Sequence, residues 1–277
     1  MGAARWTLAI VALTTSLVSC SNQQFPASTP TLATDTLHIH ATSATFPLLM
    51  DLSIAYSEQH QSFIAIDSRF ASYRSLYDDL LQDDVPYFLT NHLPTDYSWA
   101  APIAQDAIAV IVNADFDVHA LTTEQLRAIY QGRITRWNEI GGKNQPIIVF
   151  SREDGSGTRI EFERMVIGRR PITRNARVAI SSIRMIEAIT ETENSIGYVS
   201  LAYLDRSVQA LTLDGVYPTQ SNVFGNLYPL RSTIYIVGKS EPEGVYREFV
   251  GWIQSPMGQE IVAKLYTPLI DILGGQD

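Results

Sequence analysis

Residues 146–158 read Pro-Ile-Ile-Val-Phe-Ser-Arg-Glu-Asp-Gly-Ser-Gly-Thr, an apolar strand that runs directly into a short polar turn. The run 159–166 behind the turn has the pattern of a helix. A turn at a helix start leaves backbone N–H groups unpaired, and the hydroxyls of Ser156 and Thr158 add further donors. Arg152 adds a planar cation that can bind two oxygens of one anion. The stretch therefore predicts an oxyanion site between a strand and a helix.

The rest of the chain alternates strands with helices. We expect strands at 37–41, 63–66, 103–112, 146–150, 196–199 and 233–237, and helices at 47–59, 72–81, 121–130, 184–190 and 246–264. This alternation predicts an α/β fold with largely parallel sheets. In such sheets ligands bind beyond the carboxyl ends of the strands. Polar turns at 41–47 and 70–73 also join a strand to a helix, so we expect three hydroxyl-bearing junctions to converge on one anion.

Composition narrows the class of partner. The chain has 277 residues, 20 Lys and Arg against 29 Asp and Glu, and a net charge of −9. Nucleic acids and anionic membrane surfaces demand a basic face, so neither is an expected partner. A small anion remains compatible, because local dipoles and hydrogen bonds govern a desolvated site more than net charge does.

The N-terminal segment predicts the location of the protein. Arg5 precedes an apolar run, 8–18, that is too short to span a bilayer, so residues 1–20 are predicted to be a lipoprotein signal peptide. The run ends in Leu-Val-Ser-Cys20, which looks like a bacterial lipoprotein cleavage site, although a lone cysteine is more often a buried apolar residue. We expect a lipid on Cys20, a flexible tether at 21–35, and an extracytoplasmic protein anchored to a bacterial membrane, at the cell surface or in the periplasm.

Five segments, in this order, resemble landmarks of one known family, the substrate-binding protein of the high-affinity phosphate ABC transporter. They are Ala-Thr-Phe-Pro at 44–47, the segment from Leu121 to Gly141, the Arg-Glu-Asp-Gly-Ser-Gly-Thr loop at 152–158, Ser-Ile-Gly-Tyr-Val at 195–199, and Tyr-Pro-Leu-Arg at 228–231 followed by Pro-Met-Gly-Gln at 256–259. The resemblance runs over nearly all of the chain behind the tether.

The resemblance implies a fold and a set of partners. The fold is the two-lobed periplasmic-binding-protein fold of type II, in which each lobe is a mostly parallel sheet flanked by helices and the ligand lies in the interlobe cleft. Residues 36–107 and 232–277 are expected to form lobe 1, and residues 108–231 lobe 2. The implied partners are inorganic phosphate, an ABC permease and its ATPase. We expect a monomer without cofactor or metal.

The resemblance also implies the ligand-binding residues. Arg152 is expected to give a bidentate pair to two phosphate oxygens, with Asp154 holding its guanidinium in place. The remaining contacts are expected from hydroxyls and backbone N–H groups of Thr45, Phe46, Ser72, Ser156, Gly157 and Thr158.

Two positions depart from the family pattern. Asn91, which is also an expected phosphate contact, stands where family members usually carry an aspartate that accepts the proton of hydrogen phosphate. A carboxylate there repels an anion without a proton, such as sulfate, so Asn91 suggests relaxed selectivity unless Asp96 or another alignment supplies the carboxylate. The second loop, 71–75, lacks the usual glycines, so either Ser72 or Ser75 is the contact there.

Two other functions fit parts of the pattern. The same fold could bind or sense another oxyanion, such as sulfate or molybdate. A serine-dependent phosphoester hydrolase would use Ser156, but Asp154 occupies the first glycine of the Gly-x-Ser-x-Gly pattern. His92 and His119 have no spacing that ties either of them to Ser156 as a base. We therefore expect a binding protein rather than an enzyme.

Overall fold

The computed structural model of the chain describes residues 36–60, 65–96 and 99–271. The predicted signal peptide, the predicted lipid site at Cys20 and the predicted tether lie outside these residues. All described residues belong to one compact unit, 34–277.

The first lobe is built on a five-stranded part of the sheet. Strands β2 (Ala65–Ala71), β1 (Thr36–Thr42) and β3 (Tyr87–Thr90) are parallel neighbours, and β11 (Arg231–Gly238) and β4 (Trp99–Asn113) continue the sheet with antiparallel pairings. The helices of this lobe are α1 (Phe46–His60), α2 (Tyr73–Leu81), α7 (Gly244–Gln254) and α8 (Pro256–Val262).

The second lobe repeats this arrangement. Strands β8 (Ser195–Ser200), β6 (Ile148–Arg152) and β7 (Arg177–Ala179) are parallel, while β8 and β9 (Val208–Ala210) pair antiparallel with β4. The short strands β5 (Ala120–Leu121) and β10 (Thr212–Leu213) form a separate pair. The helices are α3 (Thr123–Tyr130), α4 (Gly157–Phe162), continued by a π-turn over Glu163–Ile167, α5 (Ser182–Glu191) and α6 (Gln220–Phe224), with short 3₁₀ turns at Trp137–Ile140 and Leu201–Tyr203.

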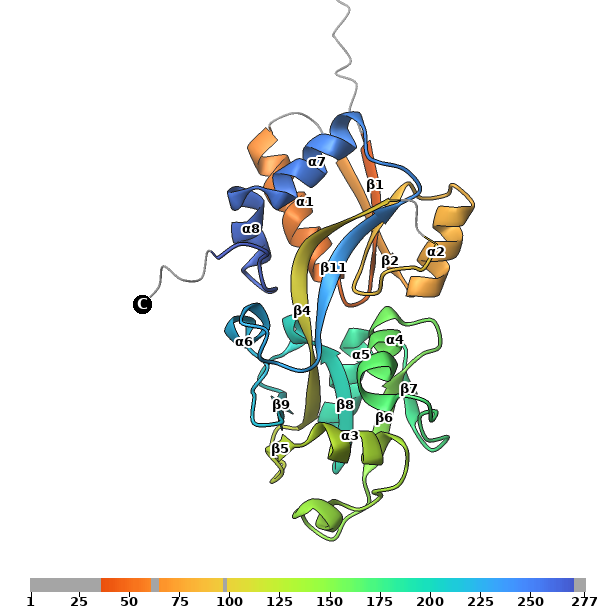
Figure 1. Cartoon of the computed structure of the whole chain (residues 1–277), viewed down its shortest axis with the longest axis vertical. Helices are drawn as coiled ribbons and strands as arrows, with labels where there is room; N and C mark the ends of the chain where they lie inside the picture. The colour runs from red at the N-terminus through yellow and green to blue at the C-terminus, as the bar shows by residue number, and fades with distance from the viewer. Residues whose placement is uncertain (1–35, 61–64, 97–98, 272–277) are drawn as a thin grey trace, which may run out of the picture. The chain divides into compact units, whose positions relative to one another are not determined.

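Strands β4 and β11 connect the two lobes, and Figure 1 shows them running side by side from one lobe into the other. The first half of β4 pairs with β11 and its second half with β8, so the strand belongs to both lobes. A strand that leaves a lobe and one that returns to it run in opposite directions. The sequence predicted largely parallel sheets, and these connecting strands are the antiparallel exception.

Each lobe has its own apolar core. The buried core of the first lobe includes Leu37, Ile39, Leu48, Leu52, Ile234, Phe249 and Ile253. That of the second includes Ile108, Val110, Leu126, Tyr130, Phe162, Tyr198 and Tyr228. These separate cores support the α/β two-lobed fold, and we propose the lobe boundaries at 107/108 and 231/232.

Helix ends follow local chemistry. The Thr122 hydroxyl accepts the backbone N–H of Gln125 at 3.1 Å, and the Gln125 side chain accepts the Thr122 N–H at 2.8 Å, which is a capping box. The single helix predicted at 246–264 is wrong, because the chain breaks it at Ser255. Proline disfavours helical backbone in the residue before it, and Ser255 is extended with ψ of 160° before Pro256 starts α8.

In the described part of the chain, none of the helices combines the length and apolar character that a membrane span requires.

Asp106, in β4, is a buried carboxyl at the junction of the lobes. It is 1% exposed, its Oδ1 accepts the Ala107 N–H at 2.8 Å, and burial raises its pKa to about 7. The unfolded chain releases this proton near pH 4, as an ordinary aspartate does. The folded protein therefore holds a proton that the unfolded chain has lost between about pH 4 and pH 7, and the free energy of unfolding falls as the pH rises through that window.

We therefore expect Asp106→Asn to stabilise the protein at pH 8 by up to a few kcal/mol. This is on the order of the free energy that corresponds to the difference between the pKa values of Asp106 in the folded and unfolded states. The amide keeps an acceptor for the Ala107 N–H but carries no charge. Urea unfolding at pH 4.5 and pH 8 measures the effect, and the gain at pH 8 should exceed that at pH 4.5. An equal or smaller gain at pH 8 contradicts the assignment.

Candidate functional site

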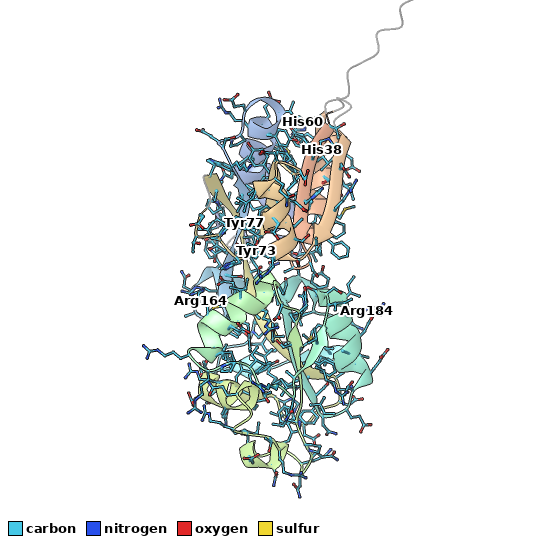
Figure 2. The ribbon with its side chains drawn as sticks, turned by 90° about the vertical axis from the view of Figure 1, so that its right-hand side faces the viewer. His38, His60, Tyr73, Tyr77, Arg164 and Arg184 are labelled. Atoms are coloured by element: carbon cyan, nitrogen blue, oxygen red, sulfur yellow. The ribbon has the colours of Figure 1, made fainter. Side chains whose placement is uncertain are left out.

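The three strand–helix junctions meet at one narrow pocket. The pocket lies between the β1–α1 turn, the β2–α2 turn and the β6–α4 turn. Its walls are Thr42, Ser43, Ala44, Ala71, Ser72, Tyr73, Arg152, Glu153, Ser156, Gly157 and Thr158. The convergence predicted from the sequence is therefore present in the structure. Figure 2 shows Tyr73 at the end of α2 that faces the second lobe.

Arg152, the last residue of β6, supplies the cation of the pocket. Its side chain is 2% exposed. Nε and Nη2 donate to Glu153 Oε2 and Oε1 at 2.8 and 2.9 Å, and Nη1 donates to Ser182 Oγ at 3.4 Å. A guanidinium has five N–H groups, so one on Nη1 and one on Nη2 remain for a further acceptor. Two N–H groups of one guanidinium suit two oxygens of one anion.

The predicted role of Asp154 is wrong. Asp154 is 87% exposed and pairs with Arg159, its Oδ1 lying 2.6 Å from Nη1. Glu153 holds the Arg152 guanidinium instead. The reason is a β-turn closed by the Ser156 N–H to the Glu153 carbonyl at 3.2 Å, with Gly155 at a φ of +85° in its third position. The turn directs Asp154, in its second position, to solvent.

The start of α4 contributes hydroxyls and backbone N–H groups. Ser156 caps the helix, and its Oγ accepts the Arg159 N–H at 3.4 Å, so the hydroxyl hydrogen stays available to a ligand. The N–H groups of the first helical turn have no carbonyl partner within the helix. Ser156, Gly157 and Thr158 are all buried and line the pocket. Their assignment as ligand contacts stays a prediction.

The first junction lines the pocket with residues other than those predicted. Thr45 is fully buried, its hydroxyl donates to the Leu89 carbonyl at 2.9 Å, and its N–H donates to the Thr42 carbonyl, also at 2.9 Å. The N–H of Thr45 thus closes the turn, and its hydroxyl ties the turn to β3. Phe46 packs against Phe70 with ring centroids 5.0 Å apart, and the role of its backbone N–H stays a prediction. The sequence analysis missed Thr42 and Ser43, although both carry hydroxyls in the same turn.

At the second junction the structure separates the two serines. Ser72 caps α2 and lines the pocket, and its Oγ accepts the Ser75 N–H at 3.2 Å. Ser75 is exposed on the helix. Of the two alternatives, Ser72 is therefore the residue placed to contact a ligand.

The two lobes touch each other around the pocket. The Ser182 N–H donates to Ser43 Oγ at 2.9 Å, the Tyr203 hydroxyl donates to the Ser43 carbonyl at 2.6 Å, and the Arg74 N–H donates to the Gly155 carbonyl at 3.1 Å. Burial raises the pKa of Tyr203 to about 12, so its hydroxyl stays a donor at neutral pH. These contacts hold the pocket in a closed arrangement.

Asn91 lies at the contact between the lobes. It is 3% exposed, and its Nδ2 donates to Thr158 Oγ1 at 3.4 Å. Its Oδ1 is buried and has no hydrogen-bond partner among the described residues. A buried acceptor without a partner is costly, which favours a ligand O–H or a water there. Asp96, the other residue considered for this role, is exposed.

A second, larger pocket of about 710 Å³ borders Asn91 on the side of β4 and β11. An ion-pair network crosses it from lobe to lobe. His92 Nδ1 lies 2.7 Å from Glu161 Oε1, and Arg164 Nη2 lies 2.6 Å from Glu161 Oε2. Burial alone would raise the pKa of Glu161, but the hydrogen bonds from His92 and Arg164 outweigh it and hold the pKa below its usual value.

Replacing Glu161 with glutamine should lower the free energy of unfolding by about 1–3 kcal/mol at pH 7, because His92 and Arg164 lose a charged partner. A carboxyl whose pKa is lowered by folding stabilises the folded protein at pH values above its pKa in the unfolded chain, which is near 4.3. This contribution is lost as the pH falls through the pKa of the carboxyl in the folded protein. Urea unfolding should therefore show a large difference from the native chain at pH 7 and a small one at pH 3. Glu124→Gln, in an exposed pair with Arg127, is the matched control. An equal effect of the two substitutions at pH 7 contradicts this account.

Comparison with known proteins finds similarity to phosphate-binding and phosphate-transport proteins. The phosphate-binding protein PstS of Bacillus subtilis is 32% identical over 174 residues, which is 61% of this chain and 57% of that protein. A phosphate ABC transporter substrate-binding protein from Clostridium perfringens, solved with bound phosphate, has a TM-score of 0.81 at 28% identity and covers 85% of this chain and 100% of its own. An ABC-type phosphate transport receptor from Vibrio cholerae, at 24% identity and a TM-score of 0.69, shares the fold.

These relatives are named as binding or transport proteins, not as enzymes. The match spans less than two thirds of the length of the curated relatives, with 57% of the Bacillus subtilis protein and 62% of the Borreliella burgdorferi one. The family model for the PBP superfamily domain matches residues 90–257, more than half of the sequence. Together with the two-lobed α/β architecture and the pocket between the lobes, this match shows that the chain belongs to the PBP superfamily.

Proposed function

We propose that the protein captures inorganic phosphate between its two lobes and delivers it to an ABC-type phosphate importer. The observation that carries the proposal is Arg152, a buried cation in a pocket lined by hydroxyls and a helix start. The named phosphate-binding relatives support the choice of phosphate among oxyanions.

The physical mechanism is capture by closure. Phosphate first meets one lobe, where Arg152 and the start of α4 offer charge-assisted hydrogen bonds of about 1.5–3 kcal/mol each. The other lobe then adds Ser43 and Ser72 and excludes water, so the ligand favours the closed state by its differential contacts. A handful of such bonds, less the costs of desolvation and ordering, is enough for micromolar or tighter affinity.

The setting is part of the proposal. The protein is an extracytoplasmic lipoprotein, anchored through Cys20 and tethered by residues 21–35, that acts as a monomer. Its closed form docks on a membrane permease driven by a cytoplasmic ATPase. The apolar run and cleavage-site pattern before Cys20 support the anchor.

Calorimetric titration with phosphate, sulfate and molybdate tests the proposal. We expect one phosphate site of micromolar or tighter affinity, and weaker binding of the other two anions. The proposal fails if phosphate gives no binding heat at millimolar concentration, or if sulfate or molybdate binds more tightly.

A serine hydrolase is not favoured by the site. The Ser156 hydroxyl caps α4, while His92 is engaged by Glu161 through Nδ1. Within the described residues, no hydrogen bond joins a histidine to Ser156. Steady hydrolysis of a generic phosphoester that is lost in Ser156→Ala would overturn the binding function.

A further inference from the structure

We propose that Glu153, rather than the residue at position 91, is the group that selects a protonated oxyanion in the narrow pocket. The inference rests on the proposed function and adds to it the carboxylate that the sequence left missing at Asn91. Glu153 is the second residue of the Arg-Glu-Asp-Gly-Ser-Gly-Thr loop.

The two carboxylates of the loop lie in different places. Glu153 lines the narrow pocket, and its side chain is 20% exposed. The neighbouring carboxylate, Asp154, is 87% exposed and pairs with Arg159 outside the pocket. Within the described part of the chain, Glu153 is the one carboxylate on the pocket wall. Any carboxylate effect on a bound anion in this pocket therefore comes from Glu153.

The Glu153 carboxylate can accept more hydrogen bonds than Arg152 gives it. Each oxygen of a carboxylate can accept about two hydrogen bonds, and each oxygen of Glu153 takes one from Arg152. One acceptor position per oxygen is left, beside the two N–H groups that Arg152 leaves free. A ligand that accepts from these N–H groups of Arg152 and donates one O–H to Glu153 would satisfy both residues.

The negative charge of Glu153 disfavours an anion without a proton. Hydrogen phosphate and dihydrogen phosphate carry an O–H, whereas sulfate at neutral pH has none. Sulfate in this pocket would place an unprotonated oxygen against the Glu153 carboxylate, and like charges in contact disfavour the wrong partner. Asn91 cannot exert this effect because its amide is neutral. Its Nδ2 is also bound to Thr158, and Asn91 lines the larger pocket instead.

The test is the ratio of phosphate to sulfate affinity in Glu153→Gln, measured by calorimetry on the full chain at pH 7. Glutamine keeps the size and an acceptor for Arg152 but removes the charge. We expect the ratio to fall at least about tenfold, mainly through tighter sulfate binding. Glu193→Gln removes an exposed carboxylate on the turn before β8 and should leave the ratio unchanged.

Other outcomes separate the alternatives. An unchanged ratio in Glu153→Gln overturns the inference, and so does an equal gain for both anions, which would make Glu153 a mere competitor for Arg152. Glu153→Asp keeps the charge and should still exclude sulfate, so sulfate binding by this variant would also overturn it. If the native chain itself binds no phosphate, the proposed function has failed rather than the role of Glu153.

Discussion

Replacing Arg152 with alanine is expected to weaken phosphate binding by at least about a hundredfold. The substitution removes two charge-assisted hydrogen bonds from the guanidinium, each worth about 1.5–3 kcal/mol. Their sum corresponds to a factor of about 10² to 10⁴ in the dissociation constant. Calorimetry measures the loss, and circular dichroism checks the fold, because Glu153 loses its partner in the same variant.

Two further variants make the Arg152 result specific. Arg152→Lys keeps the positive charge but cannot present a planar fork, so we expect it to lose most of the affinity as well. Arg184→Ala removes an exposed arginine of α5 that pairs with Glu187 and is labelled in Figure 2. It should bind phosphate like the native chain. Retention of native affinity by Arg152→Ala would show that the anion binds elsewhere.

Replacing Gly157 with alanine is expected to obstruct closure of the lobes. A Cβ at this position would lie 2.9 Å from Asn91 Oδ1 and 3.5 Å from the Cβ atoms of His92 and Tyr73, all of them in the first lobe. Overpacking of this kind costs about 1–3 kcal/mol, so phosphate affinity should fall by about fivefold to a hundredfold. The loss should appear in binding more than in the unfolding of either lobe, because the clash exists only between lobes.

Gly251→Ala is the matched control for this experiment. Gly251 lies in α7, and no atom stands within 4 Å of a Cβ built there. Alanine is favoured over glycine inside a helix, so this variant should be as stable as the native chain or slightly more so. Small-angle X-ray scattering with saturating phosphate should show a less compact Gly157→Ala protein. Equal compaction of Gly157→Ala and the native chain would contradict the steric account.

The sequence predicted the parts of the site that depend on local chemistry. Arg152 at the end of a strand, followed by Ser156 at a helix start, needed only the strand pattern and the turn residues. The α/β alternation followed in the same way from hydrophobic periodicity. The break at Ser255 could also have been predicted locally, from Pro256. The apolar helical pattern on both sides of it favoured a single long helix instead.

The errors arose where a side chain's direction depends on the turn. Asp154 and Glu153 are adjacent carboxylates, and only the β-turn closed onto the Glu153 carbonyl decides which of them returns to Arg152. Thr45 was chosen for its hydroxyl, but that donor is used by the Leu89 carbonyl of β3. Composition and spacing do not contain this information.

The contacts between lobes could not be predicted from the sequence at all. Ser43 and Ser182 are separated by 139 residues, and no local pattern marks either as the partner of the other. The same holds for His92 and Glu161, which are 69 residues apart. Such pairs are fixed by the way β4 and β11 bring the lobes together.

A crystal structure of the protein grown with phosphate tests the central claim most directly. We expect one phosphate in the narrow pocket, with two of its oxygens within hydrogen-bonding distance of Nη1 and Nη2 of Arg152 and the lobes closed around it. A phosphate bound elsewhere, or a pocket left empty at saturating phosphate while Arg152 keeps only its contacts with Glu153, Ala179 and Ser182, would contradict the claim.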